Sequence, residues 1–130
     1  MAASKALVEG ARAAGVKRLV VVGGAGSLEV APGTQLVDTA GFPDAYKAIA
    51  LAHRDALTYY RTVSDLDWTF FAPNALIKPG ERTGTFRTAA IVLVADSDGN
   101  SKISAEDYAI AFVDEIEQGR FIRQIATLAY

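Results

Sequence analysis

The 130-residue sequence contains no cysteine, one histidine, one tryptophan and one methionine. Without cysteine there can be no disulfide framework, no thiolate metal site and no cysteine nucleophile. A single histidine leaves little with which to build a Ser-His catalytic pair or a zinc site. The lack of cysteine therefore excludes enzymes with a cysteine nucleophile and small secreted domains held by disulfides. Because thiolate ligands are absent and histidine is scarce, we also expect no bound metal.

Strong charge and long apolar runs are also missing. The 13 basic and 15 acidic side chains give a net charge of −2, whereas non-specific nucleic-acid binding needs clustered Lys and Arg. The longest apolar run, residues 89–95, is far shorter than the roughly 20 residues that span a bilayer. The N-terminus lacks the pattern of a secretory signal. We therefore expect a cytoplasmic protein that binds neither nucleic acid nor membrane.

The residues that are present are sufficient for a folded domain. Hydrophobic residues make up 51% of the chain and charged residues 22%, which is typical of a globular protein. A length of 130 residues fits one domain and leaves little room for a second core. The sequence predicts a single domain over residues 1–130.

Helical and strand patterns alternate along the chain. Helical patterns cover residues 2–14, 44–62 and 104–119, strand patterns cover 18–22, 68–72 and 120–128, residues 85–95 are β-prone, and 29–42 and 74–84 are expected to be loops. Because strands separated by helices form right-handed crossovers, this order predicts an α/β fold with a parallel sheet. The expected architecture is a three-layer sandwich that opens with a helix.

Spacing also predicts the ends and the buried faces of the helices. Asp44 and Ser104 are expected to be N-caps, with Asp107 completing a capping box after Ser104. Gly15 and Gly119 are expected to end their helices. The predicted buried faces consist of Leu7, Ala11 and Ala14 in the first helix, Ile49, Ala52, Ala56 and Tyr60 in the second, and Ala109, Phe112, Val113 and Ile116 in the third.

A glycine cluster follows the first strand. Residues 24–29 match the start of a G-x-G-x-x-G dinucleotide fingerprint but lack its third glycine. That fingerprint works because a helix begins directly after the loop and faces the pyrophosphate, and Pro32 and Gly33 prevent such a helix here. We interpret the cluster as a turn whose small residues allow a ligand to approach the backbone at the carboxyl end of a strand.

Residues 96–107 partly resemble a calcium-binding EF-hand loop. Asp96, Asp98 and Asn100 stand at positions one, three and five of the twelve. Position six is Ser101 instead of glycine, and position twelve is Asp107 instead of glutamate. We favour a turn followed by a capped helix, and calcium binding is the alternative.

Candidates for catalysis are few. A tyrosine activated by a lysine needs the two residues one helical turn apart, whereas Tyr46 and Lys47 are adjacent and would point about 100° apart. His53 lies in the same helix and is expected to be a surface or packing residue. No catalytic residue is identified from the sequence.

Several segments together resemble one family. They are residues 16–28, 42–43, 66–70, 79–84, 99–109 and 126–130. These segments are similar to the C-terminal portion of atypical short-chain dehydrogenase/reductases, in particular the NAD(P)H-binding, NmrA-like and epimerase-dehydratase-like members. The resemblance implies a partial Rossmann-like three-layer α/β/α sandwich, with a parallel sheet that lacks the family's N-terminal strands and its pyrophosphate-binding glycine loop.

The same resemblance implies where NAD(P) would lie. Residues Gly23, Gly24 and Ala25 would lie beside the cofactor, and Pro73, Asn74 and Ala75 would lie near its nicotinamide ring. Related reductases place a catalytic serine near positions 24–25, and this sequence has none there. These residues alone are expected to bind NAD(P) weakly or not at all, and the substrate and the choice of NAD or NADP stay open.

Two hypotheses about function follow. The first is an NAD(P)-dependent oxidoreductase-like protein, and the second is a non-catalytic structural or interaction module that self-associates. Residues 18–22 would form a strand with one unpaired apolar edge, which is a template for pairing with another chain. We therefore expect a homo-oligomer.

Overall fold

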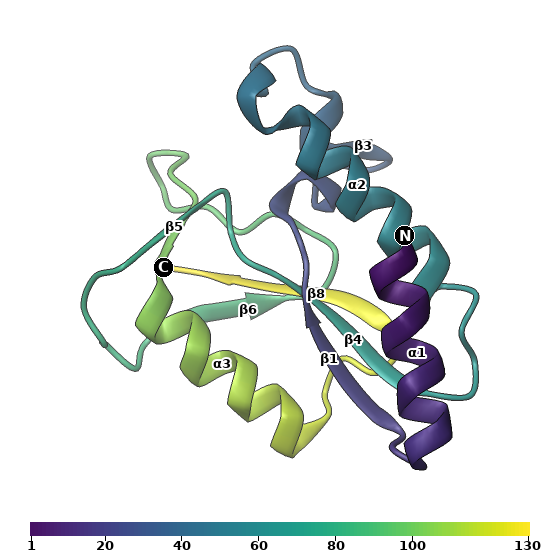
Figure 1. Ribbon diagram of the computed structural model, residues 1–130. Helices are drawn as coiled ribbons and strands as arrows, with labels where there is room; N and C mark the ends of the chain where they lie inside the picture. Colours follow the sequence, from purple (N-terminus) through teal and green to yellow (C-terminus); the bar gives the residue numbers. More distant parts are fainter.

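The computed structural model describes residues 1–130 and contains a four-stranded sheet between two layers of helix (Figure 1). The strand order is β1-β4-β8-β6. The strands are β1 (Arg18–Val22), β4 (Asp67–Ala72), β8 (Gln124–Ala129) and β6 (Arg87–Ala89). The first three are parallel, and β6 adds an antiparallel edge beside β8. The predicted α/β class and parallel sheet are confirmed.

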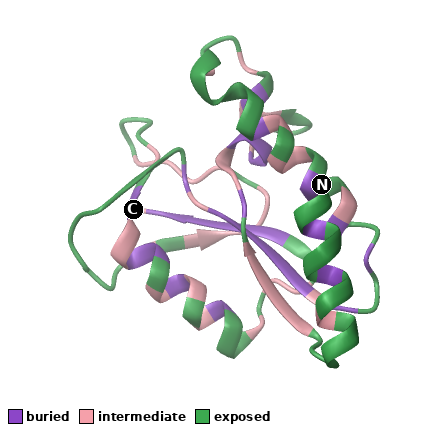
Figure 2. Ribbon diagram, viewed as in Figure 1, coloured by how far each residue is buried: buried purple, intermediate pink, exposed green.

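Helices cover both faces of the sheet. The helices are α1 (Ala2–Ala14), α2 (Asp44–Tyr60) and α3 (Ala105–Gln118). One buried cluster joins α1 and α2 to Trp68 and Phe70, and a second joins α3 to Phe71 and Leu128. Since neighbouring residues of a strand point to opposite faces, β4 contributes to both clusters, and Figure 2 shows it buried along most of its length. The three-layer α/β/α architecture is confirmed.

Short strands occupy both segments that were expected to be loops. A hairpin forms from β2 (Glu29–Ala31) and β3 (Thr34–Gln35), and β5 (Leu76–Lys78) pairs in parallel with β7 (Lys102–Ser104). In the β-prone region 85–95, β6 is the regular strand, and Val92 forms an isolated bridge with Glu29. Strands of two or three residues are too short to carry a recognisable alternation, so the loop prediction was wrong there.

The ends of the helices were mostly predicted correctly. Gly15 and Gly119 end α1 and α3 in the left-handed conformation, with φ of 72° and 59°. Ser104 caps α3 by accepting the backbone N–H of Asp107. Asp44, by contrast, is the first residue of α2 rather than its cap; Pro43 precedes it and provides no side-chain hydrogen bond.

The predicted buried faces of the helices were partly wrong. The residues that are buried are Ser4 and Val8 in α1, Ala50, Ala56, Leu57 and Tyr60 in α2, and Asp107, Tyr108, Ala111 and Glu115 in α3. Leu7, Ile49, Val113 and Ile116 are instead exposed. Each helix has apolar residues around much of its circumference, so spacing alone did not show which side meets the sheet.

No helix is both long and apolar enough to cross a membrane.

Candidate functional site

A cavity of about 560 Å³ lies where β1 and β4 end. Its wall includes all six residues that the family resemblance singled out: Gly23, Gly24, Ala25, Pro73, Asn74 and Ala75. The first three follow β1 and the last three follow β4. Because these parallel neighbours end at the same edge of the sheet, segments about 50 residues apart in the sequence meet in one site.

The glycines are required because the backbone passes close to two rings. A Cβ on Gly23 would lie 2.2 Å from the Phe70 ring, and a Cβ on Gly24 would lie 2.6 Å from Nδ1 of His53. The Gly23 N–H donates to the carbonyl of Phe71, which extends the β1–β4 pairing by one residue. Glycine at these two positions therefore allows the Phe70 and His53 rings to pack directly against the backbone.

The opposite wall was not predicted. It comes from α2 and from the segment that precedes it, through Leu36, Thr39, Gly41, Phe42, Pro43, Tyr46, Ile49, Ala50 and His53. The α2 residues follow the spacing i, i+3, i+4 and i+7, which places them on one face of a helix. That spacing was visible in the sequence, but we expected Ile49 to be part of the core and His53 to be a surface or packing residue.

No charged side chain of Asp, Glu, Lys or Arg lines this cavity. The titratable groups on its wall are Tyr46 and His53. Burial lowers the pKa of the His53 imidazole below its ordinary value, and its ring meets Phe70 edge-on at 6.4 Å. Lys47 does not line the cavity, which agrees with the expectation that Tyr46 and Lys47 do not act as a pair. The cavity therefore favours an uncharged group.

Asn74 is the most buried polar side chain on the wall. Its residue is 2% exposed, and its Oδ1 accepts a hydrogen bond from Ser101 Oγ. Its Nδ2 has no hydrogen-bond partner. A buried polar atom without a partner is uncommon in folded proteins and calls for an explanation.

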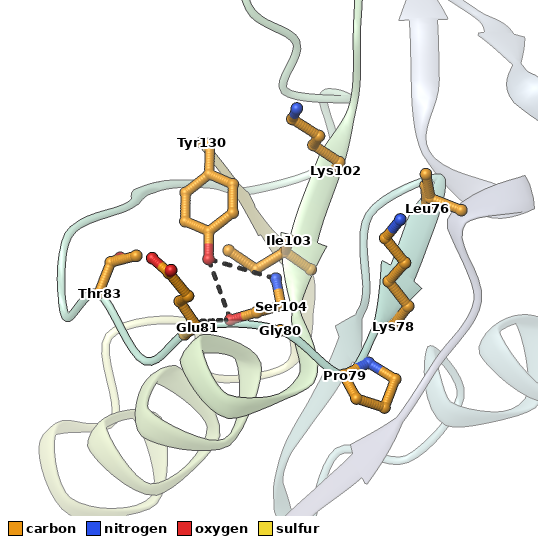
Figure 3. Close-up of a pocket in the computed structure, with 10 residues that line it drawn as sticks. All are labelled: Leu76, Lys78, Pro79, Gly80, Glu81, Thr83, Lys102, Ile103, Ser104 and Tyr130. Atoms are coloured by element: carbon orange, nitrogen blue, oxygen red, sulfur yellow. Dashed lines mark hydrogen bonds between the residues drawn. The ribbon is translucent and has the colours of Figure 1, made fainter.

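A second, smaller cavity of about 220 Å³ lies beside the C-terminus (Figure 3). Tyr130 and Ser104 meet inside it, with their hydroxyl oxygens 3.0 Å apart. Tyr130 also donates to Asp107, and Ser104 donates to the carbonyl of Glu81. These polar groups satisfy one another, so we interpret this cluster as structural.

Asp107 links α3 to the loop before β6. Burial alone would raise the pKa of its carboxyl, but hydrogen bonds from the side chains of Thr83 and Tyr130 and from the N–H groups of Gly84 and Thr83 outweigh it and lower the pKa to about 2. Asp107 Oδ2 lies 2.6 Å from Thr83 Oγ1. The carboxylate is thus already fully engaged.

The resemblance of residues 96–107 to a calcium loop is not reflected in their geometry. Asp96 accepts the N–H groups of Asp98 and Asn100, which closes a tight turn. Residues Lys102–Ser104 form β7, and Asp107 faces Thr83 and Tyr130. The chain contains no group of three or more His, Cys, Asp or Glu side chains that could hold a metal ion.

The fold and the site at the strand ends define a Rossmann-like domain of the kind that binds nucleotides beyond its strands. A sequence profile described as NAD(P)H-binding matches residues 1–118, and the chain belongs to this family. The resemblance inferred from the sequence is confirmed, and NAD(P) binding is a property of the family.

Solved structures with similar sequences have the same fold. A Burkholderia pseudomallei protein, provisionally named an exported protein, is 79% identical over 99% of this chain with a TM-score of 0.98. A provisionally named epimerase from Bacteroides thetaiotaomicron is 39% identical over 95%, with a TM-score of 0.90. A provisionally named NADH-flavin reductase from Streptococcus pneumoniae is 41% identical over 86%, with a TM-score of 0.82.

This chain spans only part of these relatives. It covers 63%, 57% and 55% of the three chains, respectively. The expected cytoplasmic location stays a prediction.

Proposed function

We propose that this chain acts within an NAD(P)-dependent oxidoreductase, where it forms the wall that holds the nicotinamide end of reduced NAD(P)H, whose ring is uncharged. The observation that carries the proposal is the 560 Å³ cavity, which lies at the ends of two parallel strands and has no charged side chain on its wall. Ligands of open α/β sheets bind at this edge. The names of the relatives, an NADH-flavin reductase and an epimerase, agree with this class of chemistry.

The residues present fit the ring end of a dinucleotide better than its phosphates. Residues Ala25–Ser27 form a single short 3₁₀ turn and lead into β2, so no α-helix begins after the glycines. No Lys or Arg lines the cavity. Because pyrophosphate binding depends on helix N-termini and basic groups, we expect these 130 residues to bind NADPH more weakly than the low micromolar range.

The chain's own residues would orient the ring and exclude water from it. Gly23 and Gly24 would present backbone to the ring on one side, while Phe42 and Ile49 would supply apolar surface on the other. When bound, the nicotinamide supplies hydride transfer. With no serine at positions 24–25, Tyr46 and His53 are the titratable side chains that could exchange a proton with a substrate here.

A matched pair of glycine variants tests the proposal. Gly24→Ala places a methyl group against His53, whereas Gly41→Ala, on the same cavity, meets nothing within 4 Å. In titrations followed by NADPH fluorescence, we expect the wild type and Gly41→Ala to give the same weak, saturable response and Gly24→Ala to lose it. An unchanged response in Gly24→Ala would contradict the proposed site, and a low-micromolar Kd would contradict weak binding.

A non-catalytic module that self-associates is the second proposal. The observation that favours it is the free edge of β1, which pairs only with β4. Val22 on this strand is 59% exposed, and the exposed side chains of Leu7 and Ile49 share a shallow apolar groove with it. Such an edge would pair with a second copy of the chain.

A further inference from the structure

Helix α3 is apolar on two opposite sides. On its inner side, Tyr108 and Ala111 pack against the sheet. On its outer side, Val113 and Ile116 are 50% and 46% exposed. No other helix covers this face of the sheet, because α1 and α2 pack on the opposite face (Figure 1). A surface helix normally has a single apolar stripe that faces the core, so the second apolar side of α3 has no use within the chain itself.

An open groove of about 520 Å³ runs along the outer side of α3. Its wall includes Arg82 from the loop before β6 and, from the helix, Glu106, Ile110, Val113, Asp114 and Glu117. These helical positions recur three or four residues apart and so lie on one face. They extend over about 16 Å of the helix. The middle of the groove is apolar, and charged residues stand at both ends.

The end of the groove where α3 begins carries an unpaired cation. Arg82 lies at this end, because the next residue, Thr83, donates its backbone N–H to Asp107 in the first turn of the helix. The carboxylate of Glu106 accepts the backbone N–H of Gly80 at 2.8 Å. Arg82 belongs to none of the four ion pairs of the chain.

The other end of the groove carries two unpaired carboxylates. Asp114 and Glu117 lie towards the end of α3, and neither forms an ion pair within the chain. The basic residue on this groove is Arg82, at the opposite end. The groove is therefore complementary to a copy of itself that runs in the opposite direction.

We propose that the outer face of α3 binds the same face of a second copy of this chain, with the two helices antiparallel about a two-fold axis. Arg82 of each copy then meets Asp114 and Glu117 of the other, and Val113 lies near the axis, against its own counterpart. Such a contact is isologous, so each ion pair forms twice. A parallel arrangement would instead bring like charges together, which is unfavourable.

This surface is separate from the sites described above. No residue of α3 lines the 560 Å³ cavity or the apolar groove beside β1. The proposal therefore goes beyond the cofactor site, and it does not depend on pairing through the β1 edge.

Single cysteines test the contact directly, because the chain has none of its own. Antiparallel helices pack with their axes about 8–10 Å apart, which brings a thiol of Val113→Cys within disulfide reach of its counterpart. The matched control is Val30→Cys, on the β2 hairpin at a position that is 44% exposed. On mild oxidation, we expect Val113→Cys to form a covalent dimer at least about ten-fold faster than Val30→Cys, because the thiols of a pre-formed pair are held together.

Charge reversal in the Val113→Cys background identifies the partner and its direction. Arg82→Glu would face the two carboxylates of a second copy with like charge, and Asp114→Lys combined with Glu117→Lys would face Arg82 in the same way. We expect each of these proteins alone to lose the fast cross-link. An equimolar mixture of the two should restore it, because every charge in the mixed pair meets its opposite.

The outcomes are distinct from those of the cofactor experiment. Equal rates for Val113→Cys and Val30→Cys would show that the outer face of α3 does not bind a second copy, and would overturn the proposal. Charge variants that still cross-link at the rate of Val113→Cys, or a mixture that does not restore the fast reaction, would overturn it as well. None of these results affects the NADPH titration, which reports on residues at the strand ends.

Discussion

Arg18 and Glu115 form an ion pair that ties the edge strand β1 to α3. Arg18 Nη2 and Glu115 Oε2 lie 2.7 Å apart, and the Glu115 side chain is 2% exposed. Glu115 also accepts the backbone N–H groups of Arg120 and Phe121, which lead into β8. Glu115 thus joins α3 to β1 and to the segment that leads into β8.

Arg18→Met should destabilise the fold strongly. It leaves the Glu115 carboxylate buried without its cation, and breaking a buried pair in this way costs about 3 kcal/mol. The matched control is Arg123→Met, which breaks an ion pair with Asp67 in which both side chains are 46% exposed; it should cost less than about 1 kcal/mol. Urea unfolding measures both, and equal losses would show that burial of Glu115 does not matter.

Trp68→Ala should have a larger effect. Trp68 is buried in the α1/α2 cluster and its Nε1 donates to the carbonyl of Val63 at 2.9 Å. Truncating a buried aromatic side chain costs about 3–5 kcal/mol. Ile49→Ala, at an exposed position, is the control and should change the urea midpoint little. A midpoint of Trp68→Ala equal to that of the wild type would contradict the packing described here.

Asp107 should make the stability of the fold depend on pH at the acidic end. The folded pKa of Asp107 is about 2, below its ordinary value of 3.8. At pH values between these two, the unfolded chain therefore binds more protons than the folded chain does. The contribution of Asp107 is fully present above pH 4 and is lost as the pH falls towards 2. In urea titrations over this range, Asp107→Asn should show a shallower loss of stability than the wild type, and parallel curves would contradict the assignment.

Pairing through β1 should make the chain self-associate at micromolar concentration. Val21, in the middle of the strand, packs against the core and is therefore unsuitable for substitution by lysine. Val22→Lys is better, because this side chain is exposed and a lysine on an edge strand opposes pairing. Light scattering should show more than the monomer mass for the wild type and a shift towards monomer for Val22→Lys. A wild type that stays monomeric would contradict the proposal.

The sequence by itself was enough to predict the α/β class, the parallel strands, and the glycine and Ser104 caps. These features depend on local chemistry, namely alternation of helix and strand patterns, the left-handed conformation of glycine and the side-chain bond of Ser104. The family resemblance supplied the pairing of residues 23–25 with residues 73–75, and the parallel register of β1 and β4 accounts for it.

The tertiary structure alone decided which side of each helix faces the sheet and what closes the cavity. Leu7 and Val8 are neighbours of similar hydrophobicity, yet only Val8 is buried, because burial depends on where the helix meets the strands. The same holds for His53, whose ring lies against Gly24, and for Ser101, which meets Asn74 across 27 positions of sequence. Contacts between distant segments depend on the packing of whole layers, and no local pattern encodes them.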